Sequence, residues 1–206
     1  MAKDYFAELK KQPYSVFIAP KPYSFDLNEN MLRLIREEFN AEGVAAKLAE
    51  EIKGKPKGEV EKIGKRIFEE YGQNWMKRTM QLGEEYSDRT VEVVKESVDR
   101  QGNQFIIFPH IPQRFVEIAY LSIQQALKIP ITLNNARELA YRMPKCTVFK
   151  AVKEKCGDEA ASLMMCKNGC LKALETIAKD MELYTINEMT ASTAKEGYCE
   201  FHMRKL

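Results

Sequence analysis

The longest periodic stretch of this chain predicts one long helix over residues 59–100. Apolar side chains recur there at helical spacing, with charged residues between them. The recurring positions are Ile63, Ile67, Tyr71, Trp75, Leu82, Tyr86, Val93 and Val98. Because glycine is unfavourable inside a helix, Gly83 suggests a kink or a break. An apolar stripe of this kind packs on a core or on a second subunit. One expectation is therefore a homo-oligomer formed through the 59–100 helix. Alternatively, the aromatic members of the stripe could line a ligand pocket.

The residues before this helix predict an N-terminal arm followed by helices. Prolines at positions 13, 20 and 22 flank a short apolar run at 14–19, which favours an extended arm with one strand. The stretch Gly54-Lys-Pro-Lys-Gly58 has the composition of a linker. We therefore expect residues 1–58 to form an arm and helices, and residues 59–206 to form the main α+β domain.

The pattern changes after Pro130, where alternating side chains replace the helical spacing. The expected elements are a strand running to Pro144, for which a short helix is the alternative, helices at 147–155 and 158–179, and strands at Leu183–Met189 and Tyr198–Arg204. The pair Asn168-Gly169 suggests an interruption of the second helix. The fold class predicted is α+β, with a helical N-terminal half that contains a long helix and a small C-terminal antiparallel sheet packed with helices.

Composition and charge exclude several classes of protein. The 206 residues include 32 basic and 30 acidic side chains, and a net charge of +2 argues against electrostatic binding of nucleic acid. No stretch approaches the ~20 apolar residues that span a bilayer, and the first residues lack the apolar centre of a secretory signal. We expect a cytoplasmic protein, whose partners are a small-molecule ligand or another protein rather than nucleic acid or a membrane.

All five cysteines lie in one module, residues 144–202. They are Cys146, Cys156, Cys166, Cys170 and Cys199. In a reducing compartment, clustered cysteines indicate a metal site or chemistry more often than disulfides, and thiolates suit zinc or an iron–sulfur cluster. The spacing is that of neither a zinc ribbon nor a ferredoxin. Buried structural thiols and a redox or nucleophilic cysteine are the alternatives.

Four of the cysteines are the candidate metal ligands: Cys146, Cys166, Cys170 and Cys199. On one uninterrupted helix, Cys166 and Cys170 would share a face, ~5–6 Å apart. With a break between them, Cys170 would lie at a helix start, whose partial positive charge favours a thiolate. Strand alternation places Cys199 on the face opposite His202. Cys156, just before Gly157, is the least convincing ligand.

The stretch from Asn187 to Phe201 resembles the end of 4-vinyl reductase domains. Those domains end in a strand glutamate, a glycine turn and a Cys-x-Phe motif, which Glu188, Gly197 and Cys199-Glu-Phe201 match here. The resemblance implies that an upstream cysteine, the glutamate and two later cysteines bind zinc beside a small-molecule pocket. Cys166, Glu188 and Cys199 match in order. The middle cysteine of that family is Ala191 in this chain, so Cys170 or Cys146 would take its place.

The chain from Glu59 onward is also similar to the L-2-amino-thiazoline-4-carboxylic acid hydrolase family. The similarity rests on Cys146 after a strand, Cys166 in a helical region and the closing Gly197-x-Cys199-x-Phe201. It implies a helical half joined to a small α/β half with an antiparallel sheet, and ring-opening hydrolysis of a small thiazoline. A thiolate or a metal-bound water would attack the ring carbon, and Glu188 or His202 would move the proton. Glu188 is therefore the candidate catalytic residue.

Three functions follow from these observations. The first is a cysteine-rich domain that binds zinc or an iron–sulfur cluster together with a small molecule or a partner protein. The second is a thiazoline-hydrolase-like enzyme, which acts on a cyclic carbon–nitrogen bond. The third is a structural or assembly subunit that packs through the long helix.

Overall fold

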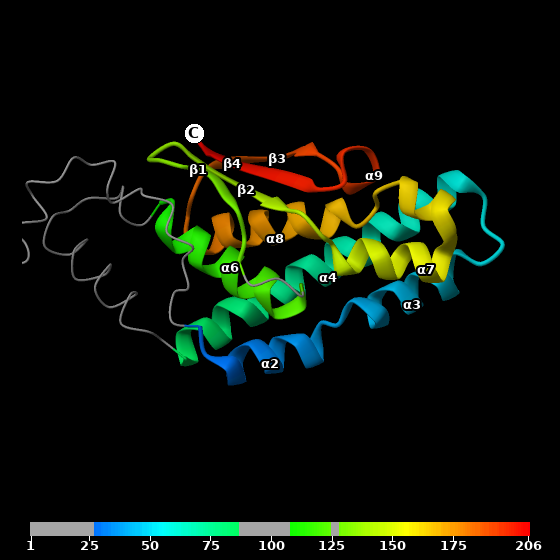
Figure 1. Cartoon of the computed structure of the whole chain (residues 1–206), viewed down its shortest axis with the longest axis horizontal. Helices are drawn as coiled ribbons and strands as arrows, with labels where there is room; N and C mark the ends of the chain where they lie inside the picture. The colour runs from blue at the N-terminus through cyan, green and yellow to red at the C-terminus, as the bar shows by residue number, and fades with distance from the viewer. Residues whose placement is uncertain (1–26, 87–107, 125–127) are drawn as a thin grey trace, which may run out of the picture.

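The computed structural model describes residues 27–86, 108–124 and 128–206, and Figure 1 shows their arrangement. Helices come first: α2 (Glu29–Glu38), α3 (Ala41–Ile52), α4 (Lys57–Glu85) and α6 (His110–Ile123). The second half contains β1 (Ile131–Asn134), β2 (Glu138–Met143), α7 (Thr147–Ser162), α8 (Lys167–Asp180), β3 (Thr185–Ala191), α9 (Thr193–Glu196) and β4 (Cys199–Lys205). This confirms the predicted α+β fold. The predicted strand at 14–19 lies outside the described residues.

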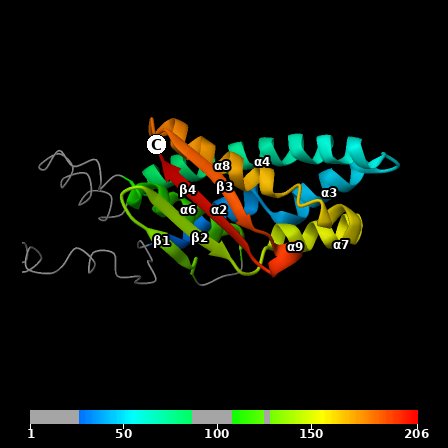
Figure 2. The same ribbon diagram turned by 90° about the horizontal axis from the view of Figure 1, so that it is seen from above.

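The four strands form one antiparallel sheet in the order β1-β2-β4-β3. In Figures 1 and 2 the sheet lies along one side of the molecule, with α8 and α6 against its inner face and α2 and α3 on the far side. Along β4, Cys199, Phe201 and Met203 are buried against the helices. The residues between them face outward, which confirms the predicted alternation.

Two close contacts place α8 and the turn before it against α4. A Cβ atom added to Gly72 would lie 2.0 Å from the carbonyl oxygen of Gly169, so only glycine permits this approach. One added to Gly64 would lie 2.2 Å from the Met165 sulfur. α4 ends at Glu85, two residues after Gly83, where the sequence suggests a kink or a break. The rest of the expected 59–100 helix lies outside the described residues.

The predicted interruption at Asn168-Gly169 is wrong in position. The chain leaves the helical path earlier, at Leu163–Cys166, where Met164 has a φ of 51°, and α8 begins at Lys167. Gly169 lies inside α8, where an added Cβ would lie only 3.0 Å from the Phe68 carbonyl oxygen. Glycine at this position therefore allows a close contact between two helices and does not mark the end of a helix. The separation of the two helices at Gly157 is confirmed, since its φ of 87° breaks the path of α7.

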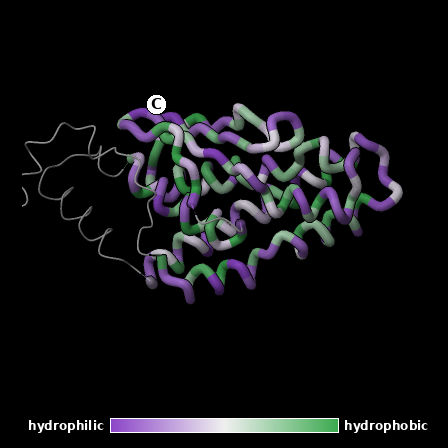
Figure 3. Tube along the Cα trace, viewed as in Figure 1, coloured by the Kyte–Doolittle hydropathy of each residue, from purple (hydrophilic) through white to green (hydrophobic). Residues whose placement is uncertain are grey.

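One continuous core runs through the described residues from Met31 to Phe201. The expected boundary at residue 58 falls in the first turn of α4, and the core continues across it. In Figure 3, hydrophobic and hydrophilic positions alternate along the helices, as expected where each helix has one buried face. Within the described ranges, none of the helices has the length and apolar character needed to cross a bilayer.

Candidate functional site

Three separate elements bring four cysteines to the same region beneath the sheet. Cys146 is the N-cap of α7, and Cys166 is the N-cap of α8. Cys170 follows in the first turn of α8, and Cys199 is the first residue of β4. These are the four cysteines that the sequence predicts as ligands. The structure matches neither sequence alternative in full, because Cys170 lies near a helix start but Cys166 is the N-cap of that same helix, with no break between them.

A small cavity lies between three of these cysteines and α4, and Cys199 does not line it. Its volume is about 20 Å³, and Cys146, Cys166 and Cys170 contribute to its wall. Tyr71 and Trp75 of α4 line it from the opposite side. A space of this size holds about one water molecule, so the site accommodates a single atom or ion rather than a large ligand.

Desolvation keeps these thiols protonated near neutral pH. It raises the pKa of Cys146 to about 11 and raises the pKa values of Cys166 and Cys170 well above the usual thiol value. Negative charge on Cys146, Cys170 or Cys199 would raise the pKa of Cys166 further. Deprotonation of these thiols would create repulsion between thiolates, which a bound cation would offset.

Hydrogen-bond donors already point at two of the sulfurs. The Phe149 amide donates to Cys146 Sγ over 3.3 Å, and the Thr193 amide donates to Cys199 Sγ over 3.4 Å. Near Cys170, a hydrogen bond from the Tyr120 hydroxyl lowers the thiol pKa against the larger effect of burial. Hydrogen bonds to sulfur stabilise its anionic form. Burial of these side chains thus disfavours the thiolate form, whereas the nearby hydrogen-bond donors favour it.

The chemistry of the donors fits a soft metal ion, but the arrangement of the side chains does not yet form a coordination shell. Four thiols in one place are the ligand set that zinc prefers in structural sites. Across the residues that the structure describes, however, no group of three or more His, Cys, Asp or Glu side chains is placed to hold a metal ion. The cysteines would have to move toward one another to ligate one.

Cys156 stands apart from the cluster. Its thiol lies 3.8 Å from the Ala45 carbonyl oxygen of α3 and shares none of the cavity wall. This placement agrees with its low ranking as a ligand and makes it a natural control residue.

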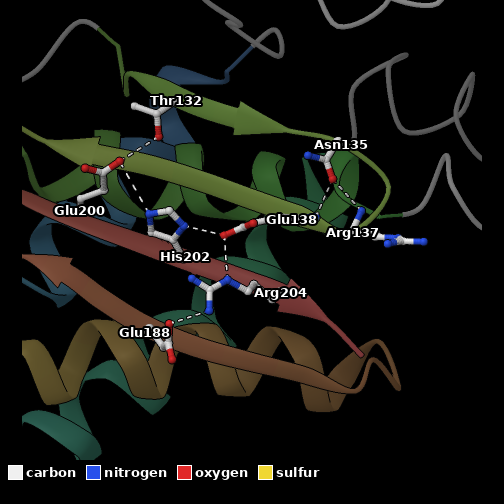
Figure 4. A network of polar contacts seen from close by, with 8 residues as sticks. All are labelled: Thr132, Asn135, Arg137, Glu138, Glu188, Glu200, His202 and Arg204. Atoms are coloured by element: carbon white, nitrogen blue, oxygen red, sulfur yellow. Dashed lines mark hydrogen bonds and ion pairs between the residues drawn. The ribbon is translucent and has the colours of Figure 1, made fainter.

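Glu188 and His202 lie on the other face of the sheet (Figure 4). The Arg204 guanidinium donates to Glu188 Oε2 over 2.8 Å. His202 Nδ1 lies 2.6 Å from Glu138 Oε1, and this contact lowers the pKa of the Glu138 carboxyl. The strand register pairs Glu188 with His202, whereas Cys199 and Phe201 of β4 face inward. The structure therefore does not bring Glu188 to the cysteines, and its catalytic role stays a prediction.

Sequence reasoning missed Gln124 and Tyr120, which both line the cavity. They lie at the end of α6 and just beyond it, where every residue from Pro112 to Ile123 is buried. The signal that could have found them is the presence of polar residues in a helix that has no solvent-facing side.

Comparison with known protein families and with curated proteins gives no match to this chain.

Proposed function

We propose that the C-terminal half of this protein binds one thiophilic metal ion, zinc, through Cys146, Cys166, Cys170 and Cys199. The observation that supports this proposal is that the four cysteines converge on one region of the structure. Residues spread over 54 positions and carried by α7, α8 and β4 reach one region, while the fifth cysteine lies elsewhere. Buried structural cysteines need no such meeting point, because each behaves as a small hydrophobic side chain in its own place.

The size of the cavity favours a single ion over an iron–sulfur cluster. At about 20 Å³ it admits one atom among the thiols, whereas a cluster brings several iron and sulfide atoms. Zinc accepts four thiolates in a tetrahedron with bonds of ~2.3 Å, so binding would require the four sulfurs to move toward one another. The amide donors of Phe149 and Thr193 would then share the negative charge of a four-thiolate site.

Zinc content tests the proposal directly. Protein purified under reducing conditions is expected to hold one equivalent of zinc, and the Cys170→Ala and Cys199→Ala variants should retain much less. Cys156→Ser is the matched control, because it removes a thiol outside the cluster. A wild type that takes up no zinc, or a Cys156→Ser variant that loses it like the others, would contradict the site. Iron and acid-labile sulfide in place of zinc would show a cluster instead.

The orientation of Glu188 yields a separate expected result. Because Glu188 faces away from the cysteines and pairs with Arg204, Glu188→Gln should leave zinc content unchanged. The same zinc assay measures this. Loss of zinc in this variant would show that the ligand set includes the glutamate, as the resemblance to 4-vinyl reductase domains implies.

A further inference from the structure

The two edges of the sheet differ in how well they are protected against pairing with another strand. At one edge, β1 has only four residues, and its register shifts between Ile131 and Leu133. At the other edge, β3 has seven residues with a single charge, Glu188, and no proline. Within the described ranges, no strand pairs with the free side of β3. Short strands, irregular register, proline and lysine are the usual protection of an edge, so β3 is the less protected of the two.

The register of β3 shows which of its backbone groups are free. The Leu206 amide donates to the Tyr184 carbonyl oxygen over 2.9 Å, so the backbone of Tyr184 faces β4. Hydrogen-bonded and non-hydrogen-bonded positions alternate in an antiparallel pair. The N–H and C=O groups of Thr185, Asn187 and Met189 therefore point away from β4, along the open edge. They provide a row of donors and acceptors for one more antiparallel strand.

Exposed apolar side chains lie beside this edge. Tyr184 is 81% exposed, Ile186 is 45% exposed and Leu206 is 76% exposed. The three lie in or next to β3 and β4 at positions that face away from the helices, and the register places Leu206 opposite Tyr184. They are three of the four large hydrophobic side chains that are exposed among the described residues. An apolar patch of this kind, next to an open edge, marks an interaction surface.

A groove lies beside β3 on the helical side of the sheet. Its volume is about 260 Å³, and its wall comes from Asn187, from α8 and from α4. Figure 2 shows β3 on the side of the sheet nearest to these two helices. The charged side chains in the wall are Lys65, Glu69, Lys172 and Glu175, two of each sign. A balanced wall is complementary to a copy of itself, because a two-fold axis can place lysines near glutamates.

We infer that β3 pairs with β3 of a second copy of this chain, in antiparallel orientation, so that the two sheets continue across a two-fold axis. Side-chain chemistry selects the register. With Ile186 on the axis, the two isoleucines meet, and Tyr184 of each copy lies opposite Glu188 of the other, to which its hydroxyl can donate. An axis at Asn187 would set Ile186 against Glu188. An axis at Glu188 would oppose two carboxylates, which destabilises a sheet.

This register also uses the free backbone groups of the edge. Thr185 of one copy lies opposite Asn187 of the other, and both present their N–H and C=O groups across the axis. The same pairing brings the two groove walls toward each other on the helical side. The paired segment is short, so we expect association in the micromolar range, as for small interfaces. None of these residues is a cysteine, and the inference does not depend on the proposed zinc site.

Sedimentation equilibrium of the full chain, under reducing conditions and at micromolar concentrations, measures this association. Ile186→Lys places two ammonium groups at the axis, so the dissociation constant of the dimer should rise at least about tenfold. Leu133→Lys is the matched control, because it adds the same charge at an exposed apolar position of the opposite edge, and it should dimerise as the wild type does. A wild type that stays monomeric, or a dimer that Ile186→Lys leaves unchanged, would overturn the inference.

An engineered disulfide tests the register separately. Ile186→Cys places two thiols opposite each other at the axis, at a backbone separation that a disulfide can bridge. Mild oxidation should therefore give a covalent dimer on a non-reducing gel, beyond any background from the native cysteines of the wild type. Glu188→Cys should give none, because its two copies lie about 13 Å apart along the strands. Cross-linking through Glu188→Cys and not through Ile186→Cys would refute the assigned pairing.

Discussion

Gly72→Ala is expected to destabilise the protein by at least about 2 kcal/mol, although alanine is the better helix former. The new Cβ would lie 2.0 Å from the Gly169 carbonyl oxygen and 2.6 Å from its carbonyl carbon. Both atoms belong to the backbone of α8, so relief requires the two helices to separate. The intrinsic gain of about 1 kcal/mol in helix propensity cannot offset that loss of packing.

Two other glycines of α4 provide graded controls. Gly58→Ala should be neutral or stabilising by up to about 1 kcal/mol, because nothing lies within 4 Å of its new methyl group. Gly64→Ala should fall between the two, since the nearest atom is the flexible Met165 sulfur at 2.2 Å. Urea unfolding midpoints give the comparison. A Gly72→Ala variant as stable as the wild type would mean that α4 and α8 do not cross as described.

The second large effect concerns Glu117, a carboxyl buried within α6. Its side chain is 1% exposed, and desolvation raises its pKa from the usual 4.5 to about 8. Gln113 Nε2 donates to Oε1 over 2.8 Å, while Oε2 has no partner among the described residues. The folded protein therefore keeps this proton over a pH range in which the unfolded chain has lost it.

The sign of the pH dependence follows from that difference. Between pH 4.5 and 8 the folded state binds more protons than the unfolded state, so stability falls as pH rises. Glu117→Gln mimics the protonated acid and should abolish this loss. We expect it to match the wild type near pH 4.5 and to exceed it by roughly 4 kcal/mol at pH 8.

Urea unfolding of both proteins at these two pH values measures the effect. Glu84→Gln on the exposed face of α4 serves as the control and should not change the pH dependence. A Glu117→Gln variant that gains nothing at pH 8 would show that the carboxyl is ionised in the fold.

The sequence was most informative where periodicity alone decides structure. Alternation in the last strand predicted which side of the sheet receives Cys199, and it separated Cys199 from His202 correctly. Helical spacing located α4 because its charged and apolar faces differ. These features depend on neighbours along the chain, which a sequence records directly.

Features that depend on neighbours in space were missed or misplaced. Gly169 reads as a helix stop in the sequence, yet it is required by the backbone of α4. Glu188 matches a motif, but its direction depends on strand register, and the register pairs it with His202 on the outer face. That the indole nitrogen of Trp75 has no partner among the described residues follows from packing in space that no local pattern describes.

The order of the sheet has a consequence for how the chain reaches its native state. β4 lies between β2 and β3 in space but follows both of them in the sequence. Until β4 has been synthesised, β2 lacks a partner on one side and β3 has none at all in this sheet. Both strands then present unpaired backbone groups, the kind of edge that recruits other chains. A product truncated ahead of Cys199 should therefore aggregate, and the cysteine cluster would be completed only by the strand that closes the sheet.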